Sequence, residues 1–219
     1  MGSTERRERE RAETRKKLMD AAGRLFAARG YDAVSLRQVA DLAEYSPTAV
    51  YVHFKDKADL IRQVTYDAFG QFEAPLVAMR SIPDPIDRIY AVGIAYIRFA
   101  VEHPHHYRLM FMTPPHESTP PEPDEIQNPD LSGYGVLRNS CREGAAAGRF
   151  KPCYNDPELL TQTLWATVHG VASLQIVAEA HTWIPWRSVE ARAHAACRGM
   201  LDGLTEEGTE ARRHEGEDG

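Results

Sequence analysis

The chain has 219 residues, of which 42% are hydrophobic and 26% are charged, so a buried core is expected rather than disorder. No run in the sequence resembles a secretory signal, because the first seventeen residues are mostly Arg, Lys and Glu, and the most apolar stretches fall short of the roughly 18 uninterrupted apolar residues of a membrane span. The net charge of −6 is uneven, because residues 1–62 carry 13 Lys and Arg against 10 Asp and Glu, whereas the remainder carries 13 against 22. We therefore expect a cytoplasmic protein with no membrane partner, in which nucleic-acid binding stays open for the N-terminal part alone.

The first predicted helix runs from about residue 8 to 29, where apolar side chains recur at helical spacing. It ends at Gly30, a residue type that favours the left-handed position just past a helix. Ser35 and Gln38 then have the spacing of a capping box, which predicts a second helix over about 36–43.

A third, short helix is predicted to begin at Pro47. Ser46 is a good N-cap, and proline at the first helical position loses no hydrogen bond. Asp56 and Asp59 have the positions of a cap and first turn, so the third helix must end before them. Two helices joined by about three residues form a predicted helix-turn-helix, whose second helix can enter a major groove.

The rest of the chain predicts a larger bundle of amphipathic helices with no strand pattern, so the fold class is all-α. The helices are expected near residues 56–80, 86–101, 104–111, 131–148, 156–182 and 186–206. A proline-rich acidic segment, TPPHESTPPEPDEIQNPD, is expected to be a mobile loop, and the tail from Gly208 onward to be disordered. The expected domains are an N-terminal arm (1–14), a helix-turn-helix domain (15–62), a helical effector-binding and dimerisation domain (63–207) and an acidic tail (208–219).

The first of these domains resembles the DNA-binding domain of TetR-type (TetR/AcrR) transcriptional regulators. The resemblance is carried by LFAARGYDAVSLRQVADLA, by Ser46, and by YVHFKDKADL, in which Tyr51, His53, Phe54, Lys57 and Leu60 keep the family's order and spacing. It implies that side chains in the second and third helices face base edges, and that others hold backbone phosphates. The implied DNA-binding residues are Ser35, Arg37, Ser46, Pro47, Thr48, Ala49, Tyr51, His53, Lys55 and Lys57. For His53, a structural, hydrogen-bonded histidine remains the alternative.

Two features of the N-terminal part depart from a simple match. The family usually has glycine and a small aliphatic residue where this chain has Glu44 and Tyr45, and a left-handed Glu44 would carry strain of about 1 kcal/mol. The preceding segment, ERRERERAETRKK, has two interpretations: a solvated helix start, or an arm whose Arg6, Arg7, Arg9 and Arg11 reach DNA. The interleaved glutamates argue against a strong effect of such an arm.

The larger part resembles the C-terminal domain of TetR-type regulators that is named for its Trp-His-Gly motif, here Trp165, His169 and Gly170 within LWATVHGVASL. The resemblance implies an effector pocket among the middle helices and a dimer interface formed by the last two. Candidate pocket residues are Tyr96, Phe99, Tyr107, Met110, Phe111, Tyr134, Trp165 and His169, although aromatic residues at these spacings are also typical of a core. Candidate interface residues are Gly170, Ser173, Leu174, Val177, Cys197 and Leu201, although the small ones could equally pack within one subunit.

Other chemistries find little support in the sequence. The three cysteines, including Cys141 and Cys153, lack metal-type spacing, and the histidines near Pro104 have no supporting cysteine or carboxylate, so we expect no metal and no cofactor. No set of nucleophile, base and orienting group indicates an enzyme.

The expected function is that of a ligand-responsive repressor that binds a palindromic operator in double-stranded DNA as a homodimer and is released by a small apolar or amphipathic effector. A DNA-bound scaffold that recruits a partner protein without sensing a small molecule is the alternative, and an activator is not distinguished by the sequence.

Overall fold

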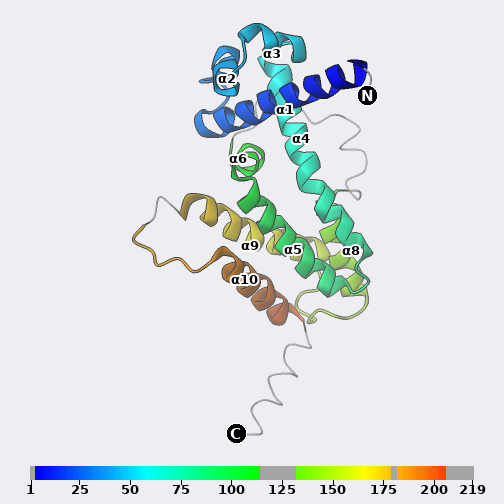
Figure 1. The fold of residues 1–219 in the computed structure, drawn as a ribbon. Helices are drawn as coiled ribbons and strands as arrows, with labels where there is room; N and C mark the ends of the chain where they lie inside the picture. The colour runs from blue at the N-terminus through cyan, green and yellow to red at the C-terminus, as the bar shows by residue number, and fades with distance from the viewer. Residues whose placement is uncertain (1–2, 114–131, 179–181, 206–219) are drawn as a thin grey trace. The chain divides into compact units, whose positions relative to one another are not determined.

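In the computed structural model, residues 3–113, 132–178 and 182–205 are described, and within them the chain is helical, as predicted (Figure 1). The only β-pairing in this part of the chain is an isolated bridge between Phe150 and Thr205. The helices are α1 (Ser3–Arg29), α2 (Leu36–Ala43), α3 (Pro47–His53), α4 (Lys57–Ala78), η1 (Met79–Ser81), α5 (Pro85–Glu102), α6 (Pro104–Tyr107), η2 (Arg108–Met112), α8 (Gly133–Ala146), α9 (Pro157–Val177) and α10 (Val189–Leu204). No helix in the described ranges combines the length and apolar character needed to cross a bilayer.

The chain divides into two compact units, each described here by itself. Among the described residues, the first unit contains 3–71 and 103–113, and the second contains 72–102 and 132–205. This grouping differs from the domain boundary expected after residue 62, because α6 and η2 pack on α1 and Leu109 joins the core of the first unit. The expected mobile loop and acidic tail lie almost wholly outside the described residues.

The core of the first unit forms where α1, α2, α3 and the start of α4 meet. Leu18, Ala22 and Phe26 of α1 are buried there, as their helical spacing predicted. Gly30 has a φ of 75°, and Tyr31 folds back so that its ring stacks on Phe26 at 5.8 Å between centroids. The predicted stop of the first helix is therefore confirmed, whereas its start lies earlier than predicted, at Ser3.

The helix-turn-helix is defined by side-chain caps that the sequence predicted. The Ser35 hydroxyl accepts from the Gln38 amide at 3.3 Å, and the Gln38 side chain accepts from the Ser35 amide at 2.8 Å, which completes a capping box on α2. Ser46 caps α3 by accepting from the Ala49 amide at 3.3 Å, and Pro47 occupies the first turn. Both caps are confirmed, and they set where the two helices begin.

In the first unit, α6 and η2 replace the single helix predicted over 104–111. His106 of α6 lies against α1, where its ring approaches Gly23 and its Nδ1 atom is buried without a hydrogen-bond partner. Burial lowers the pKa of His106 and the neighbouring His103 lowers it further, whereas Asp20 of α1 and Asp67 of α4 act in the opposite direction. The neutral imidazole is therefore the favoured form in the folded state.

The second unit is organised around α5, which packs against α8, α9 and α10 (Figure 1). Gly93 of α5 allows α9 and α10 to approach closely, since a Cβ atom there would lie 2.9 Å from the Cys197 sulfur and 3.2 Å from a Val168 methyl. Cys141 and Cys197 are both buried, and burial raises the pKa of each thiol to about 11. These thiols are consequently core residues rather than reactive groups.

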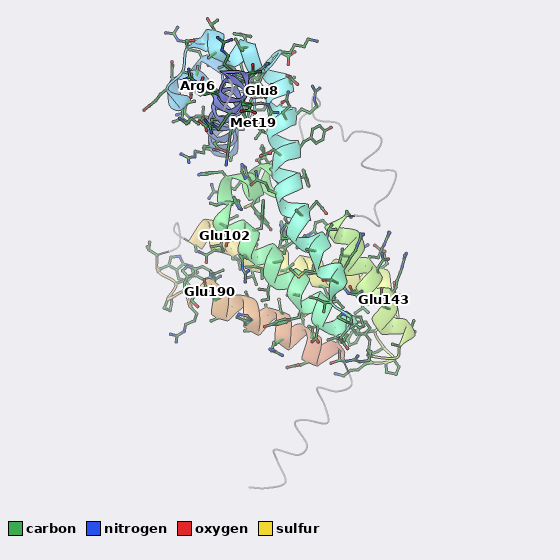
Figure 2. The ribbon with its side chains drawn as sticks, turned by 45° about the vertical axis from the view of Figure 1, so that its right-hand side comes forward. Arg6, Glu8, Met19, Glu102, Glu143 and Glu190 are labelled. Carbon is green, nitrogen blue, oxygen red and sulfur yellow. The ribbon has the colours of Figure 1, made fainter. Side chains whose placement is uncertain are left out.

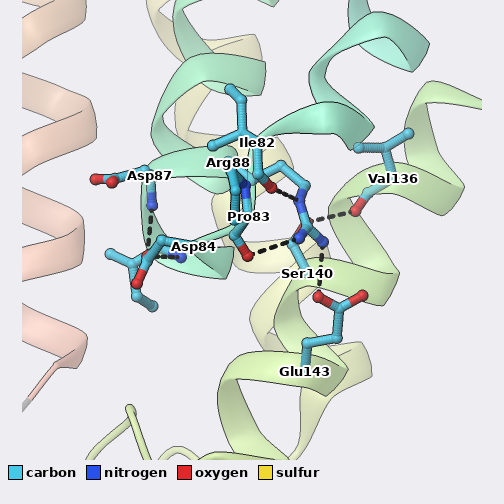
Figure 3. A network of polar contacts seen from close by, with 9 residues as sticks. Ile82, Pro83, Asp84, Asp87, Arg88, Val136, Ser140 and Glu143 are labelled. Atoms are coloured by element: carbon cyan, nitrogen blue, oxygen red, sulfur yellow. Dashed lines mark hydrogen bonds and ion pairs between the residues drawn. The ribbon is translucent and has the colours of Figure 1, made fainter.

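A buried arginine joins the beginning of α5 to α8 (Figure 3). Arg88 donates through Nε to the Ile82 carbonyl at 2.9 Å and through Nη2 to the Pro83 carbonyl at 3.1 Å. Its Nη1 donates to Glu143 of α8 at 2.8 Å, beside the Ser140 hydroxyl at 3.4 Å. Only 8% of Arg88 is exposed, so these acceptors compensate for the loss of water around its charge.

Candidate functional site

The third helix presents one buried and several exposed side chains. Val50 is fully buried and anchors α3 in the core of the first unit. Tyr51 and Val52, which follow it, are each 61% exposed, although large hydrophobic side chains usually lie inside. Thr48 is exposed on the preceding turn. An exposed apolar and aromatic helix surface of this kind indicates a binding face.

The structure brings the predicted DNA-binding residues together on α2, α3 and the turns around them. Arg37 is exposed on α2, and Lys55 is exposed just past α3. The residues Ser35, Ser46, Pro47 and Thr48 are exposed, and Ala49 is half-buried. The whole set therefore lies in the first unit, and none of its members is fully buried.

His53 lies at the last turn of α3, half-buried beside the ring of Phe54. Burial lowers the pKa of His53, and the nearby guanidinium groups of Arg11 and Arg15 lower it further. A neutral imidazole carries one N–H donor, which is enough to donate to a phosphate oxygen. The cationic environment also means that two arginines of α1 lie close to this end of α3.

Lys57 is held in place by contacts that the sequence did not predict. Its ammonium lies 4.1 Å from the centroid of the Tyr31 ring and within 3.4 Å of the Asp32 carbonyl. A cation over an aromatic face gains about 0.5–1 kcal/mol at an exposed site. The contact restricts a flexible side chain at the N-terminus of α4, where the Asp56 side chain accepts from the Asp59 amide at 2.7 Å.

The turn between α2 and α3 contains the left-handed residue that the departure from the family pattern suggested. Glu44 has φ 61° and ψ 38°, and it is the only non-glycine residue with positive φ in the described part of the chain. Its amide donates to the Asp41 carbonyl at 3.2 Å, and the Tyr45 amide donates to the Ala40 carbonyl at 2.9 Å. These two bonds form the Schellman motif that ends α2 and turns the chain toward α3.

Sequence reasoning missed Val52 and the part of α1 that faces the helix-turn-helix. The guanidinium of Arg15 lies 5.6 Å from the centroid of Phe54 and also donates to the Gln63 side chain. The Thr14 hydroxyl donates to the Glu10 carbonyl at 2.9 Å and lies 3.4 Å from the Tyr45 hydroxyl, from which it can accept. Helical spacing from Leu18 could have found these contacts, because residues 14 and 15 lie one turn before it on the same face.

A cluster of aromatic and polar groups lies within the second unit. The indole N–H of Trp165 donates to the Tyr96 hydroxyl at 3.2 Å, and that hydroxyl lies 3.1 Å from Nδ1 of His169. The hydroxyl therefore links the indole of Trp165 to the imidazole of His169. Burial lowers the pKa of His169, which favours the neutral form. The ring of Tyr134 approaches Trp165 edge-on at 5.9 Å.

Tyr96 of this cluster also packs against buried phenylalanine rings. Phe72 lies 5.3 Å from the Tyr96 ring and 5.2 Å from Phe99, both edge-on. Five of the predicted pocket residues are therefore in the second unit: Tyr96, Phe99, Tyr134, Trp165 and His169. Tyr107, Met110 and Phe111 belong to the first unit, where Tyr107 is fully buried and its ring centroid lies 4.9 Å from that of Phe111, with the two rings tilted by 50°. A pocket shared by both sets stays a prediction.

The predicted interface residues differ in their exposure within the subunit. Leu174 of α9 is 50% exposed, and a Cβ atom at Gly170 would meet nothing within 4 Å. Ser173 and Val177 are half-buried. Cys197 and Leu201 are each only 6% exposed. These two contribute to the subunit's own core, so they have little surface left for a partner.

A groove of about 210 Å³ lies between α5 and α10 in the second unit. Its apolar lining includes Ile97, Val101 and Ala193. Arg98 and Glu190 add charge to the lining. The groove is separate from the cluster around Tyr96, and its mixed lining suits a small amphipathic molecule.

Comparisons with known proteins agree with this architecture. Residues 18–64 match the model of the bacterial regulatory proteins of the tetR family, and residues 89–208 match the model of the tetracyclin repressor-like C-terminal domain. The chain is 27% identical over 146 residues to the HTH-type transcriptional repressor KstR2 of Mycolicibacterium smegmatis, covering 64% of this chain and 69% of that protein. It is 31% identical over 102 residues to the HTH-type transcriptional activator FasR of the same organism, covering 46% and 47%.

A solved structure shares the fold over nearly the whole chain. It is a TetR family transcription regulator from Marinobacter aquaeolei VT8, with a TM-score of 0.70, 18% identity, and coverage of 90% of this chain and 98% of that one. The relatives are transcriptional regulators rather than enzymes. The two family models together span the helix-turn-helix and the larger helical part. The chain therefore belongs to the TetR family of DNA-binding transcriptional regulators.

Proposed function

We propose that this regulator is a ligand-responsive repressor that binds a palindromic operator as a homodimer. The proposal that α3 binds DNA rests on the exposure of its side chains. Tyr51 is 61% exposed, whereas the adjacent Val50 is buried and holds α3 against the core of the first unit. Groove contacts need such exposed side chains on a rigidly held helix. In a dimer, two such helices about one DNA turn apart would read two half-sites.

The roles of the individual residues follow from their positions on this face. Thr48 and Tyr51 would reach base edges or thymine methyl groups, together with Arg37 of α2. His53 and Lys57 would hold phosphates at the edges of the groove. The tethering of Lys57 over Tyr31 supports this role, because a positioned cation loses less conformational entropy on binding.

The DNA-binding part is tested with an operator selected from a random-sequence duplex library. We expect Tyr51→Ala combined with Lys57→Ala to weaken operator binding by at least about 100-fold, since each lost contact is of the order of 1–3 kcal/mol. Arg80, exposed in η1 of the second unit, supplies the matched control Arg80→Ala. Unchanged binding by the double variant would refute the proposed face.

We infer that the effector binds at the cluster formed by Tyr96, Trp165 and His169. Indole and phenol rings provide apolar area, and the hydrogen bonds between them fix their orientation before a ligand arrives. Binding there would change DNA affinity only by the difference in effector affinity between the DNA-bound and free conformations. Rings of this kind would suit a small apolar or amphipathic molecule.

The experiment for this part is a thermal-shift screen of such molecules, followed by release of the bound operator. A hit should lose its effect in Tyr96→Phe or His169→Gln and keep it in Leu159→Ala, which alters an exposed residue of α9. A hit lost instead in Ala193→Leu would assign the effector to the groove between α5 and α10. Compounds that never release DNA, with a partner protein recruited to the complex, would favour the scaffold alternative.

The dimer is proposed to form through the exposed sides of α9 and α10. Gly170 would allow close helix approach, and Leu174, Ser173 and Val177 would surround the contact. We leave Cys197 and Leu201 out of this interface because they are buried in the subunit. Light scattering after size exclusion should give a dimer for the native chain and a monomer for Leu174→Asp, with Leu159→Asp as the exposed control on the same helix. A dimer that survives Leu174→Asp would contradict this surface.

A further inference from the structure

The N-terminal half of α1 segregates its charges in a way that the sequence conceals. Residues 4–13 contain four glutamates and four arginines, so the segment is balanced when charges are counted along the chain. It is, however, part of one continuous helix from Ser3 to Arg29, and residues 4–13 are all exposed (Figure 2). On a helix each residue is rotated by about 100° from the previous one, so neighbours in sequence face different directions.

The contacts of Thr14 and Arg15 fix which direction faces the helix-turn-helix. Thr14 reaches Tyr45, and Arg15 reaches Phe54 and Gln63, so this side of α1 points to the end of α3 and the start of α4. Leu18, one turn later on the same side, is fully buried in the core. The orientation of the exposed part of α1 therefore follows from contacts on the page and from helical geometry.

Going back along this side toward the N-terminus, the next residues are Arg11 and Arg7. They are about 40° apart around the helix and about 6 Å apart along it. Neither takes part in an ion pair among the described residues, whereas Arg6 pairs with Glu10 at 3.3 Å. The guanidinium of Arg11 is close enough to His53 to act on its ionisation.

Two of the glutamates flank this side of the helix and the other two lie away from it. Measured from the midpoint between Arg7 and Arg11, Glu8 and Glu10 are about 80° away around the helix, and Glu5 and Glu13 are about 140° away. The stripe formed by Thr4, Arg7, Arg11 and Arg15, which we call the arginine stripe, thus contains no acidic residue. Arg6 and Arg9 belong to the opposite side, among the more distant glutamates.

We propose that the arginine stripe of α1 binds DNA phosphates beyond the half-site that α3 contacts, with Arg7 and Arg11 as the binding residues. The proposal rests on the DNA-binding role of α3, and it extends the contact surface by about 12 Å along α1 from Arg15 to Arg7. Arginine suits this role because its planar guanidinium donates two hydrogen bonds to one phosphate. In the free protein, the neighbouring guanidinium groups of such a row repel one another. On DNA their contacts with phosphates become favourable, because condensed counterions are released.

The chain offers a matched control for this surface. Arg7→Ala with Arg11→Ala removes two charges from the arginine stripe, and Arg6→Ala with Arg9→Ala removes two from the other side of the same turns. Operator binding is measured by fluorescence anisotropy over a salt series on the selected duplex, and on a random duplex of equal length. Each neutralised phosphate contributes about 0.9 to the slope of log K against log salt, so the stripe variant should flatten the slope by about 3 to 4 per dimer. The control should change it by less than about 1.

Each outcome decides the question. The loss of affinity in the stripe variant should be similar on both duplexes, because phosphate contacts carry no sequence information. Arg7→Lys with Arg11→Lys should restore most of the slope, and far-ultraviolet circular dichroism should show equal helix content in all variants. Equal effects of the two double variants, or no effect of either, would overturn the proposal. A loss confined to duplexes with A·T-rich flanks would also overturn it in favour of minor-groove insertion. If the native chain binds neither duplex, the DNA-binding assignment itself fails, and the result is distinct from a failure of the stripe.

Discussion

Replacing Glu44 by glycine should stabilise the first unit. Glu44 holds φ 61° and ψ 38°, a left-handed conformation that costs a residue with a Cβ atom about 1–2 kcal/mol. Glycine removes this cost but loses more conformational entropy on folding, about 0.5–1 kcal/mol. The glutamate side chain is exposed, so its removal changes little else. The net expectation for Glu44→Gly is a gain of about 0.5–1 kcal/mol in the free energy of unfolding, or a rise of a few degrees in Tm.

The assay must separate the two units, because they need not unfold together. All three tryptophans, at positions 165, 183 and 186, lie in the second unit, so indole fluorescence follows that unit alone. Circular dichroism follows both. In a urea titration the Glu44→Gly variant should shift the dichroism transition to higher urea while the fluorescence transition stays in place.

Glu44→Ala is the control for this prediction. It removes the same charge but keeps the Cβ atom, so it keeps the left-handed cost and should be no more stable than the native chain. If Glu44→Gly and Glu44→Ala have the same stability, the strain at this turn is not what the backbone angles indicate, and the reasoning is wrong. Operator affinity of the glycine variant should stay within about threefold of native, because the Schellman hydrogen bonds use only backbone groups.

Three further predictions concern the packing of the two units. Arg88→Met should lower the free energy of unfolding of the second unit by about 1–3 kcal/mol, because it removes the donors to the Ile82 and Pro83 carbonyls and the ion pair with Glu143. Arg142→Met, at an exposed position, should change it little. Gly93→Ala should lower the free energy of unfolding by about 1–3 kcal/mol, because the added methyl group overpacks the contact of α5 with α9 and α10. Gly70→Ala, where the added methyl group meets nothing within 4 Å, should raise it by about 0.5–1 kcal/mol, and urea titrations measure both changes. Burial lowers the pKa of His106 from its ordinary 6.5, so the folded state binds fewer protons than the unfolded state and stability is lost as the pH falls below about 6.5. His106→Gln should therefore flatten the dependence of Tm on pH between about 7 and 5, and an unchanged dependence would contradict this origin.

The helix-turn-helix was predictable because its signals are local. The box between Ser35 and Gln38 and the cap from Ser46 to Ala49 each close within four residues, so spacing alone fixes where α2 and α3 begin. The same holds for the stop at Gly30, where the following ring folds back by a few positions. The departure at Glu44 was also informative. The family's usual glycine at this position indicates a turn with positive φ, and Glu44 adopts that conformation although it has a Cβ atom.

What the sequence could not predict depends on contacts between distant segments. The helical period indicates that Cys197 lies on an apolar face, but only the close approach of α5 at Gly93 shows that Cys197 packs inside the subunit. The predicted helix over 104–111 divides into α6 and η2, and it joins a core made by residues some eighty positions earlier. No local pattern encodes that pairing. The chain Trp165–Tyr96–His169 is of the same kind, because its members are on two helices.

The charged segment at the start of α1 shows how a single long-range contact changes the meaning of a local pattern. Read as a string, ERRERERAETRKK alternates sign, and its interleaved glutamates argued against an electrostatic role. The alternation has a short period, whereas the helix repeats every 3.6 residues, so the two signs separate onto different sides. That separation matters only when one side of α1 is known to face the groove-binding helix. The contact between Thr14 and Tyr45 shows which side does so, and thereby fixes the rotational phase of the helix. Once the phase is fixed, Glu5 and Glu13 no longer oppose DNA binding by Arg7 and Arg11, because they lie on the far side of the helix, and Glu8 and Glu10 flank the stripe without lying on it.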